Sequence, residues 1–363
     1  MNPRGLILRA RRLATSPAQR LRAAKQAFTW AAGPARYDRY HTGAPQKGRL
    51  RIAADNVAWA LRYGEVNDGY FLVGLDAVNA DSTPLHRKRY LMDLIGTQIK
   101  SRRAGSLQSL LKDKYLFALV AQALDYPSPK TLALMGPAGV TALSPRRSVG
   151  YVDLADIEGG LRGFCKPAGG QDGKGAFLLE AGGGRLAVDG EAVGPDGVRA
   201  RVKARYVVQE RIEQHPELAF FHAPSVNTLR FLTVHVDGRA RVFSVVFRVG
   251  AGGSAVDNWS SGGLLVLVDS STGRLTGRGL YKPGMAPAGS GVAVPSHPDT
   301  GVEFDGYPIP MFEEASSLVV RFHEDLGPLV MIAWDIAVTP AGPVVIEGNT
   351  HPDGRAHMAL DPS

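Results

Sequence analysis

The stretch MIAWDIAVTPAGPVVIEGNTHPDG, residues 331–354, decides the fold expected for this chain. Two apolar, β-rich runs flank a Pro340-Ala341-Gly342 turn, a pattern that is typical of a β-hairpin. We expect Thr339 to pair with Pro343 across a three-residue loop, with Gly342 in the left-handed conformation. The stretch therefore predicts an antiparallel pair of strands.

This register brings three oxygen-bearing side chains to one patch of the hairpin. Asp335 lies directly opposite Glu347, and Asn349, two residues on, shares the face of Glu347. Hard oxygen ligands of this kind suit Mg²⁺, which is usually held by one or two carboxylates plus substrate phosphates. The alternative is that Asp335 and Glu347 are ordinary strand-end charges, although an unpaired carboxylate in a buried apolar run is costly. These residues alone leave both interpretations open.

Length and composition indicate an ordinary folded protein. With 363 residues, the chain is long enough for two domains or one large composite domain. Its 43 glycines and 24 prolines favour a loop-rich α/β or α+β protein. Cys165 is the only cysteine, which excludes a disulfide framework and a cysteine zinc site and is typical of a reducing compartment.

The excess positive charge lies in the amino-terminal segment. The formal net charge is +8, and residues 1–37 carry eight basic side chains and no acidic one. The other 34 of the 42 basic residues balance the 34 acidic residues, so the rest of the chain is about neutral. Such an arm could contact anionic lipid, nucleic acid or an acidic partner, or it could be a frayed helix packed on its own protein.

Signals for secretion and membrane spanning are not recognised in the sequence. The first residues lack the apolar core of a secretory signal, and no uninterrupted apolar stretch is long enough to span a bilayer. We therefore expect a cytoplasmic protein, with weak contact between residues 1–36 and the inner membrane face left open. We expect no nucleic-acid partner, and a homodimer is also left open.

The secondary-structure pattern predicts a helical part followed by a mixed part. A basic helix over 1–32 and helical spacing near 57–61 and 90–95 indicate a small, mostly helical amino-terminal domain. Asp113 is the expected N-cap of a later helix. The expected helices cover 113–125, 151–162 and 311–325, and the expected strands cover 163–167, 176–180, 185–188, 204–209, 228–236, 239–249 and 262–269. Residues 270–310 form a long Gly/Pro-rich excursion of a kind that is usually functional.

Two segments carry weak nucleotide signals. A glycine-rich loop follows Lys166, but it is not a P-loop, because Ala168 stands where glycine is needed and Gly175 where serine or threonine is needed. Its backbone N–H groups could still surround phosphate oxygens, or the loop could be a plain solvated turn. The segment VVQERIEQHPEL, residues 207–218, could read adenine through its backbone and hold ribose through a carboxylate.

Together these segments resemble the ATP-grasp superfamily in order and spacing, from about Asp113 onward. The most similar variety is the sugar-transfer-associated ATP-grasp family. The segments behind this are QHPEL…NTLRFLTV, FRVG…VDNWSSGG, HPDTG with YPIP, and WDIAVTPAGPVVIEGN. The resemblance implies an α+β ATP-grasp fold, in which two α+β subdomains clasp ATP, preceded by a small, mostly helical region. The expected parts are a basic arm (1–36), a helical domain (37–112) and two ATP-grasp lobes (113–208 and 209–363).

The resemblance also implies the roles of particular residues. The nucleotide site would comprise two phosphate-binding lysines, a lid over the phosphates, an adenine hinge and a ribose carboxylate. The lysines would be Lys114 and Lys166, and the lid would be residues 169–175 with Gly170, Gly173, Lys174 and Gly175. The adenine hinge would comprise Gln209, Glu210, Arg211 and Ile212, and the ribose carboxylate would be Glu217. The metal ligands for two Mg²⁺ ions would be Asp335, Glu347 and Asn349. The residues expected to contact the reacting groups are Arg248, Asn258 and Arg230.

The implied function is that of an ATP- and Mg²⁺-dependent ligase. ATP would activate a carboxylate as an acyl phosphate, which an amine or another nucleophile then attacks. The substrate would be a small-molecule or peptide carboxylate in polysaccharide, peptide or secondary-metabolite biosynthesis, an association that rests on the family alone. Two alternatives stay open, a kinase of the same fold that phosphorylates a small-molecule hydroxyl and a non-catalytic nucleotide-binding scaffold.

Overall fold

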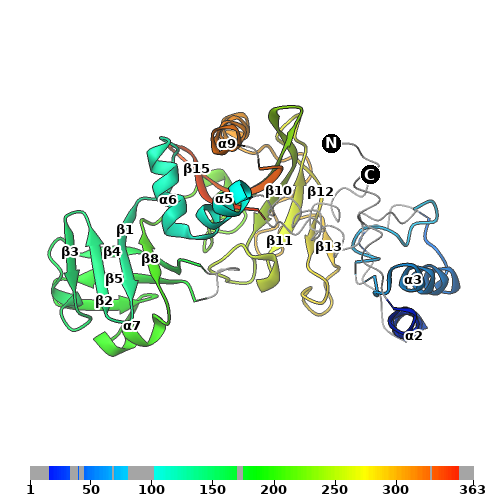
Figure 1. The fold of residues 1–363 in the computed structure, drawn as a ribbon, viewed down its shortest axis with the longest axis horizontal. Helices are drawn as coiled ribbons and strands as arrows, with labels where there is room; N and C mark the ends of the chain where they lie inside the picture. Colours follow the sequence, from blue (N-terminus) through cyan, green and yellow to red (C-terminus); the bar gives the residue numbers. More distant parts are fainter. Residues whose placement is uncertain are drawn as a thin grey trace. The chain divides into compact units, whose positions relative to one another are not determined.

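The chain divides into two units, which are described separately (Figure 1). The computed structural model describes residues 16–32, 40, 45–67, 69–80, 102–169, 175–327 and 329–350. The first unit comprises Met1–Thr97, Ala286–Ala293 and Asp353–Ser363. The second comprises Gln98–Met285 and Val294–Pro352 and contains both large sheets.

The first unit contains two packed helices, α2 (Pro17–Ala32) and α3 (Arg49–Tyr63). Small side chains form their contact, because Ala23, Ala24 and Ala27 of α2 pack in one apolar cluster with Ala60 of α3. Gly64 ends α3 in the left-handed conformation, and its N–H bonds to the Ala60 carbonyl. Across the described ranges, no helix combines the length and hydropathy that crossing a bilayer would require.

The first sheet of the second unit has eight strands around one apolar core. Their order is β3-β2-β1-β8-β4-β5-β6-β7. The strands are β1 (Thr131–Gly136), β2 (Gly139–Leu143), β3 (Arg146–Val149), β4 (Leu161–Pro167), β5 (Phe177–Gly182), β6 (Arg185–Val188), β7 (Glu191–Ala192) and β8 (Tyr206–Gln209). Cys165 of β4 is fully buried in this core, and burial raises the pKa of its thiol, so it is an apolar core residue rather than a nucleophile. The short helix α7 (Pro195–Arg201) adds Val198 to the same core.

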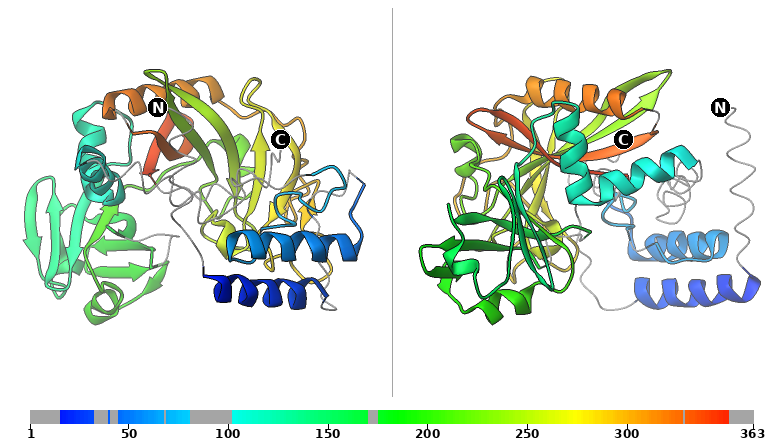
Figure 2. Two further views of the ribbon diagram at one scale, coloured as in Figure 1. Left: turned by 45° about the vertical axis from the view of Figure 1, so that its right-hand side comes forward. Right: turned by 60° about the vertical axis from the view of Figure 1, so that its left-hand side comes forward.

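The second sheet has seven strands in the order β13-β12-β11-β10-β9-β14-β15. They are β9 (Thr228–Val236), β10 (Arg239–Val249), β11 (Leu264–Val268), β12 (Leu275–Tyr281), β13 (Ala293–Val294), β14 (Met331–Thr339) and β15 (Gly342–Asn349). Helix α9 (Phe312–Leu326) contacts β9, β10, β14 and β15 and runs along the sheet (Figure 2). Its Phe322 stacks on the fully buried Trp334 of β14 with ring centroids 4.9 Å apart.

Two helices, α5 (Arg102–Lys112) and α6 (Lys114–Ala123), contact strand β15 of the second sheet. The Asp113 carboxylate accepts the backbone N–H groups of Tyr115 and Leu116 at 2.9 and 3.0 Å, which confirms the predicted N-cap. The backbone N–H of Lys114 also donates to the carbonyl oxygen of Ala168, just after β4. The first turn of α6 is therefore attached to the end of a strand from the other sheet.

Two local predictions were wrong, and a third concerns residues outside the described ranges. The helix expected over 151–162 is only a 3₁₀ turn, η2 (Leu154–Asp156), because Gly159 and Gly160 both take positive φ and β4 begins directly afterwards. The 270–310 excursion contains strand β12, although no strand was predicted there. The helix expected near 90–95 lies outside the described residues.

Gly163 in β4 has no room for a side chain. A Cβ atom there would lie 2.6 Å from the Gln209 carbonyl oxygen and 2.7 Å from Val208 Cγ1, both in the paired strand β8. We expect Gly163→Ala to lower the free energy of unfolding by about 1–3 kcal/mol, measured by urea denaturation. Gly136→Ala in the same sheet is the control, because its Cβ would meet no atom within 4 Å. Equal stabilities of the two variants would contradict the prediction.

Candidate active site

The terminal hairpin places Asp335 opposite Glu347, as predicted, but the turn length and the strand register beside the turn differ from the prediction. Strand pairing joins Asp335 to Glu347, while Thr339 pairs with Gly342 rather than with Pro343. The loop therefore has two residues, not three, because the Thr339 hydroxyl caps the turn by bonding the Ala341 N–H and the Gly342 carbonyl. A register shift between Asp335 and Ile336 restores the predicted pairing at the far end.

Two arginines from neighbouring strands bind the Asp335 carboxylate. Arg230 lies opposite Asp335 in β9 and donates from Nε and Nη2 to its two oxygens, both at 2.7 Å. Arg248, near the end of β10, donates from Nη1 at 2.6 Å. Burial alone would raise the pKa of Asp335, but the charges of Arg230 and Arg248 outweigh it and hold the pKa well below its usual value. Asp335 therefore stays ionised in the sheet.

A second carboxylate, Asp257, completes this network. It accepts from Arg248 Nη2 at 3.0 Å and from the Thr228 hydroxyl. Burial raises the pKa of Asp257 even though Arg248 opposes this effect. Burial would lower the pKa of Arg248, but the carboxylates of Asp257, Asp335 and Glu347 raise it, so the guanidinium stays charged. Sequence reasoning did not single out Asp257 as a site residue. The available signal was the position of Arg248 in an apolar strand, because a buried guanidinium there needs a carboxylate partner.

Two lysines approach the same carboxylates from the first sheet and α6. Lys114 lies 3.5 Å from Glu347, measured from Nζ to Oε2. Lys166, near the end of β4, is only 8% exposed, and no hydrogen bond or ion pair joins its side chain to another described residue. Burial lowers its pKa to about 8, partly offset by Glu347, while the charge of Lys114 lowers it further. Lys166 is thus a desolvated cation beside a second cation, which is a favourable environment for an anion.

The cluster as a whole is cationic. It combines four basic side chains with three acidic ones, drawn from α6, both sheets and the loop after β10. These are Lys114, Lys166, Arg230 and Arg248, with Asp257, Asp335 and Glu347. The buried donors of this set could bind a polyanion such as a nucleotide phosphate chain.

The predicted metal ligands are compatible with Mg²⁺ by their chemistry. Asp335 and Glu347 are register partners, and Asn349 lies two residues beyond Glu347 on the same face. Two carboxylates and an amide oxygen suit Mg²⁺ when phosphates supply further ligands. In the described part of the chain, no group of three or more His, Cys, Asp or Glu side chains could hold a metal without such help. Both Asp335 oxygens already accept arginine donors, so a metal there would share them.

The predicted adenine hinge begins at Gln209, the last residue of β8. The buried Gln209 donates from its amide toward the Pro129 carbonyl at 3.4 Å, and the Glu210 carboxylate accepts the Lys130 N–H at 2.9 Å. These bonds attach the hinge to the segment that precedes β1. Arg211 is exposed and Ile212 half-buried. Among the described residues, no side-chain hydrogen bond or ion pair joins these hinge residues to the cationic cluster.

The remaining predicted residues are less closely connected with the cluster. Glu217 is exposed in the first turn of α8 (Pro216–Ala219), and Tyr307 donates to its backbone carbonyl. Asn258 follows Asp257 and caps the 3₁₀ turn η3 (Trp259–Ser261) by accepting the Ser260 N–H. Of the predicted lid, Gly175 has φ +77°, whereas Gly170, Gly173 and Lys174 lie outside the described residues.

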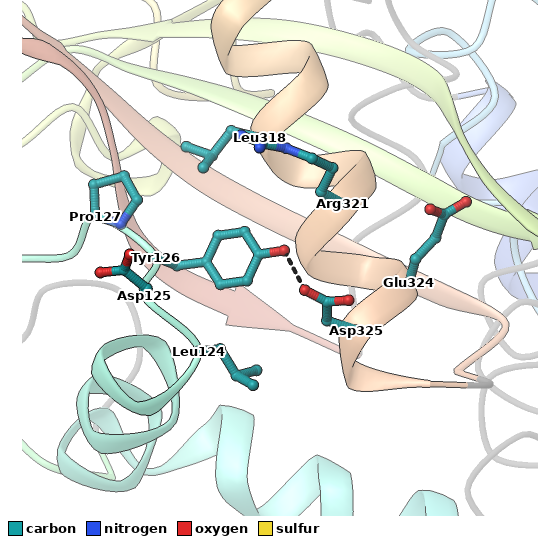
Figure 3. A pocket seen from close by; sticks show the side chains of 8 residues that line it. All are labelled: Leu124, Asp125, Tyr126, Pro127, Leu318, Arg321, Glu324 and Asp325. Atoms are coloured by element: carbon teal, nitrogen blue, oxygen red, sulfur yellow. Dashed lines mark hydrogen bonds between the residues drawn. The ribbon is translucent and has the colours of Figure 1, made fainter.

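A surface pocket of about 380 Å³ lies elsewhere, between the end of α6 and α9 (Figure 3). In it, the Tyr126 hydroxyl donates to the Asp325 carboxylate at 2.6 Å, and the Tyr126 ring stacks on Phe322. None of the residues that line it belongs to the predicted site. The pocket therefore does not help to locate the nucleotide.

The comparison with known families agrees with the resemblance found in the sequence. The family described as sugar-transfer associated ATP-grasp matches residues 98–363. No curated protein matches the chain. Among solved structures, D-alanyl-alanine synthetase A from Vibrio cholerae is 12% identical with a TM-score of 0.36, over 68% of this chain and 56% of that protein.

Two further solved structures match at a similar level. An L-amino acid ligase from Bacillus licheniformis is 10% identical with a TM-score of 0.36, over 69% of this chain and 43% of that one. The N5-carboxyaminoimidazole ribonucleotide synthetase from Thermotoga maritima is 10% identical with a TM-score of 0.36, over 72% and 48%. The chain spans about half the length of these proteins.

Proposed function

The chain belongs to the sugar-transfer-associated ATP-grasp family, and from this premise we propose that it is an ATP-dependent ligase that activates a carboxylate. The γ-phosphoryl group of ATP passes to a carboxylate oxygen, giving ADP and an acyl phosphate. An amine or another nucleophile then attacks the acyl carbon, phosphate leaves, and the nucleophile loses its proton.

The observation that carries the proposal is the convergence of four cations on the Asp335–Glu347 patch. Lys114 and Lys166 would bind nucleotide phosphates, since Lys166 is buried without a counter-ion bond to any other described residue. Arg248 would bind the transferred phosphoryl group, because a planar guanidinium suits it better than an ammonium. Such chemistry needs positioning and neutralisation of negative charge rather than covalent participation by the protein.

Mg²⁺ belongs to the same proposal. Asp335, Glu347 and Asn349 would hold it, together with phosphate oxygens. When bound, the metal would supply charge neutralisation at the phosphates. The chain's own residues then orient the groups: Arg230 fixes the Asp335 carboxylate, and Lys114 approaches Glu347 from α6.

A hydroxylamine trap tests the proposed reaction. The full-length protein is incubated with ATP, Mg²⁺, hydroxylamine and pooled carboxylates, namely amino acids, short peptides, uronic acids and aminosugar acids. We expect an acid-dependent hydroxamate together with ADP, because hydroxylamine intercepts acyl phosphates. Glu347→Gln is expected to lower the rate by about 10²–10³-fold.

A matched variant separates the site from general effects of charge. Glu180 is an acid of β5 that pairs with Arg162 and lies outside the cluster, so Glu180→Gln should keep the wild-type rate. ADP formed with a phosphorylated hydroxyl compound and no hydroxamate would instead indicate a kinase. Absence of ATP binding would refute the proposed site.

A further inference from the structure

The turn His297-Pro298-Asp299-Thr300-Gly301, within the 270–310 excursion, holds the loop that follows β10. The imidazole Nε2 of His297 bonds to the carbonyl oxygen of Gly250 at 2.7 Å. The Asp299 carboxylate accepts the backbone N–H of Gly252 at 2.7 Å. His297 is only 1% exposed, so its bond to Gly250 is shielded from water. Two side chains of one turn therefore bind two backbone groups of one loop.

The neutral imidazole of His297 has a donor and an acceptor nitrogen, and both are used. A carbonyl oxygen can only accept, so Nε2 carries the proton, and Nδ1 is left to accept the Asp299 N–H at 3.3 Å. Burial lowers the pKa of His297, which keeps the ring neutral and preserves this arrangement at neutral pH. One imidazole thus bonds both the loop and its own turn.

The turn itself is anchored to the rest of the lobe. The Gly301 N–H bonds to the His297 carbonyl, and the His297 N–H bonds to the Val302 carbonyl, both at 2.8 Å. The Thr300 hydroxyl donates to the carbonyl oxygen of Phe221 at 3.2 Å. The turn is therefore a fixed support rather than a free tip.

The opposite side of the loop is also held. The Gly250 N–H donates to the Asn227 side-chain oxygen at 3.2 Å. A Cβ on Gly250 would lie 2.5 Å from the Ser225 hydroxyl and 2.6 Å from Nδ1 of His222, so only glycine fits here. The loop is consequently fixed between residues 222–227 and the 297–301 turn.

This loop joins two members of the cationic cluster. Arg248 precedes it and Asp257 follows it, and the two side chains bond at 3.0 Å. We propose that His297 and Asp299 are positioning residues that fix residues 250–256 and thereby hold Arg248 and Asp257 at the reacting phosphoryl group. This role rests on the proposed function, and it assigns a task to the 270–310 excursion.

Paired substitutions in the full-length protein test the proposal. His297→Leu removes the donor to Gly250, whereas His297→Gln keeps an N–H at a similar position. We expect the leucine variant to lower kcat by about 10–100-fold with an unchanged KM for ATP, since the two lysines proposed to bind its phosphates lie in α6 and β4, outside the loop. We expect the glutamine variant to stay within about threefold of the wild type. Asp305→Ala in the same excursion, which removes a bond to the Gly277 N–H and leaves the 297–301 turn intact, should keep the wild-type rate.

Hydrogen–deuterium exchange gives a readout that does not depend on activity. Peptides covering 250–258 should exchange faster in His297→Leu than in the wild type, while peptides from β4 and β5 should not change. A folded leucine variant with wild-type kcat and wild-type exchange would overturn the proposal. If His297→Leu does not fold, the exposed Asp299 gives a second pair of variants. Asp299→Ala removes the acceptor of the Gly252 N–H, whereas Asp299→Asn keeps an oxygen there. Wild-type protein without hydroxamate would refute the proposed function, and the exchange result would then still decide whether the turn fixes the loop.

Discussion

Replacing Asp335 with asparagine is expected to lower the free energy of unfolding by about 3–5 kcal/mol. Asparagine keeps the size of the side chain but removes its charge, which leaves the guanidinium groups of Arg230 and Arg248 without their shared counter-ion. Three bonds of 2.6–2.7 Å now join these groups to Asp335, whose side chain is only 9% exposed. Urea denaturation of the full-length protein at neutral pH measures the effect.

Glu347→Gln is the matched control for stability. Glu347 is the other carboxylate of the predicted metal site, but its side chain is 30% exposed and its ion pair with Lys114 spans 3.5 Å. Its replacement should change the free energy of unfolding by less than about 1 kcal/mol. Both variants should lower the rate of the proposed ligase reaction, so stability alone distinguishes them. An Asp335→Asn protein with wild-type stability would show that the arginines find other partners.

Replacing Lys166 with methionine is expected to affect stability and function in opposite directions. Lys166 is buried beside Lys114, and burial has lowered its pKa, so its charge opposes folding. Methionine has a similar length and no charge, and we expect a higher thermal unfolding temperature. We expect ATP-dependent turnover to fall by about 10²–10³-fold, because the cation that is proposed to bind phosphate is lost.

The pH dependence of stability provides a second measure of the same residue. The pKa of Lys166 falls from 10.5 to about 8 in the folded protein. Between these values the unfolded state binds more protons, so this residue makes stability rise as the pH increases from 8 to 10.5. The methionine variant should lack that contribution, which denaturation curves at pH 8 and pH 10 would detect.

The exposed Lys203 offers a control for the methionine substitution. Lys203→Met should change neither the unfolding temperature nor the rate of turnover. A Lys166→Met protein that is destabilised, or that retains full activity, would contradict the proposed role of Lys166.

The sequence alone predicted much of the second sheet and of the fold. The strands predicted at 228–236 and 239–249 appear as β9 and β10, which pair across Asp237 and Gly238, because turn chemistry and strand pattern are local properties. The family resemblance, which rests on local motifs, is confirmed over residues 98–363. The sequence also predicted that Asp335 faces Glu347, but this pairing depends on a register shift between Asp335 and Ile336 that the sequence did not indicate.

Only the tertiary structure decided how the charges are satisfied. Nothing local indicates that Asp257 pairs with Arg248 or that Arg230 binds Asp335, which is 105 residues away. The same holds for the 297–301 turn, whose His297 bonds a loop 47 residues earlier in the chain. A buried charge or carbonyl group must find a partner, but the sequence does not state which one, because strand order and loop packing determine which distant groups meet.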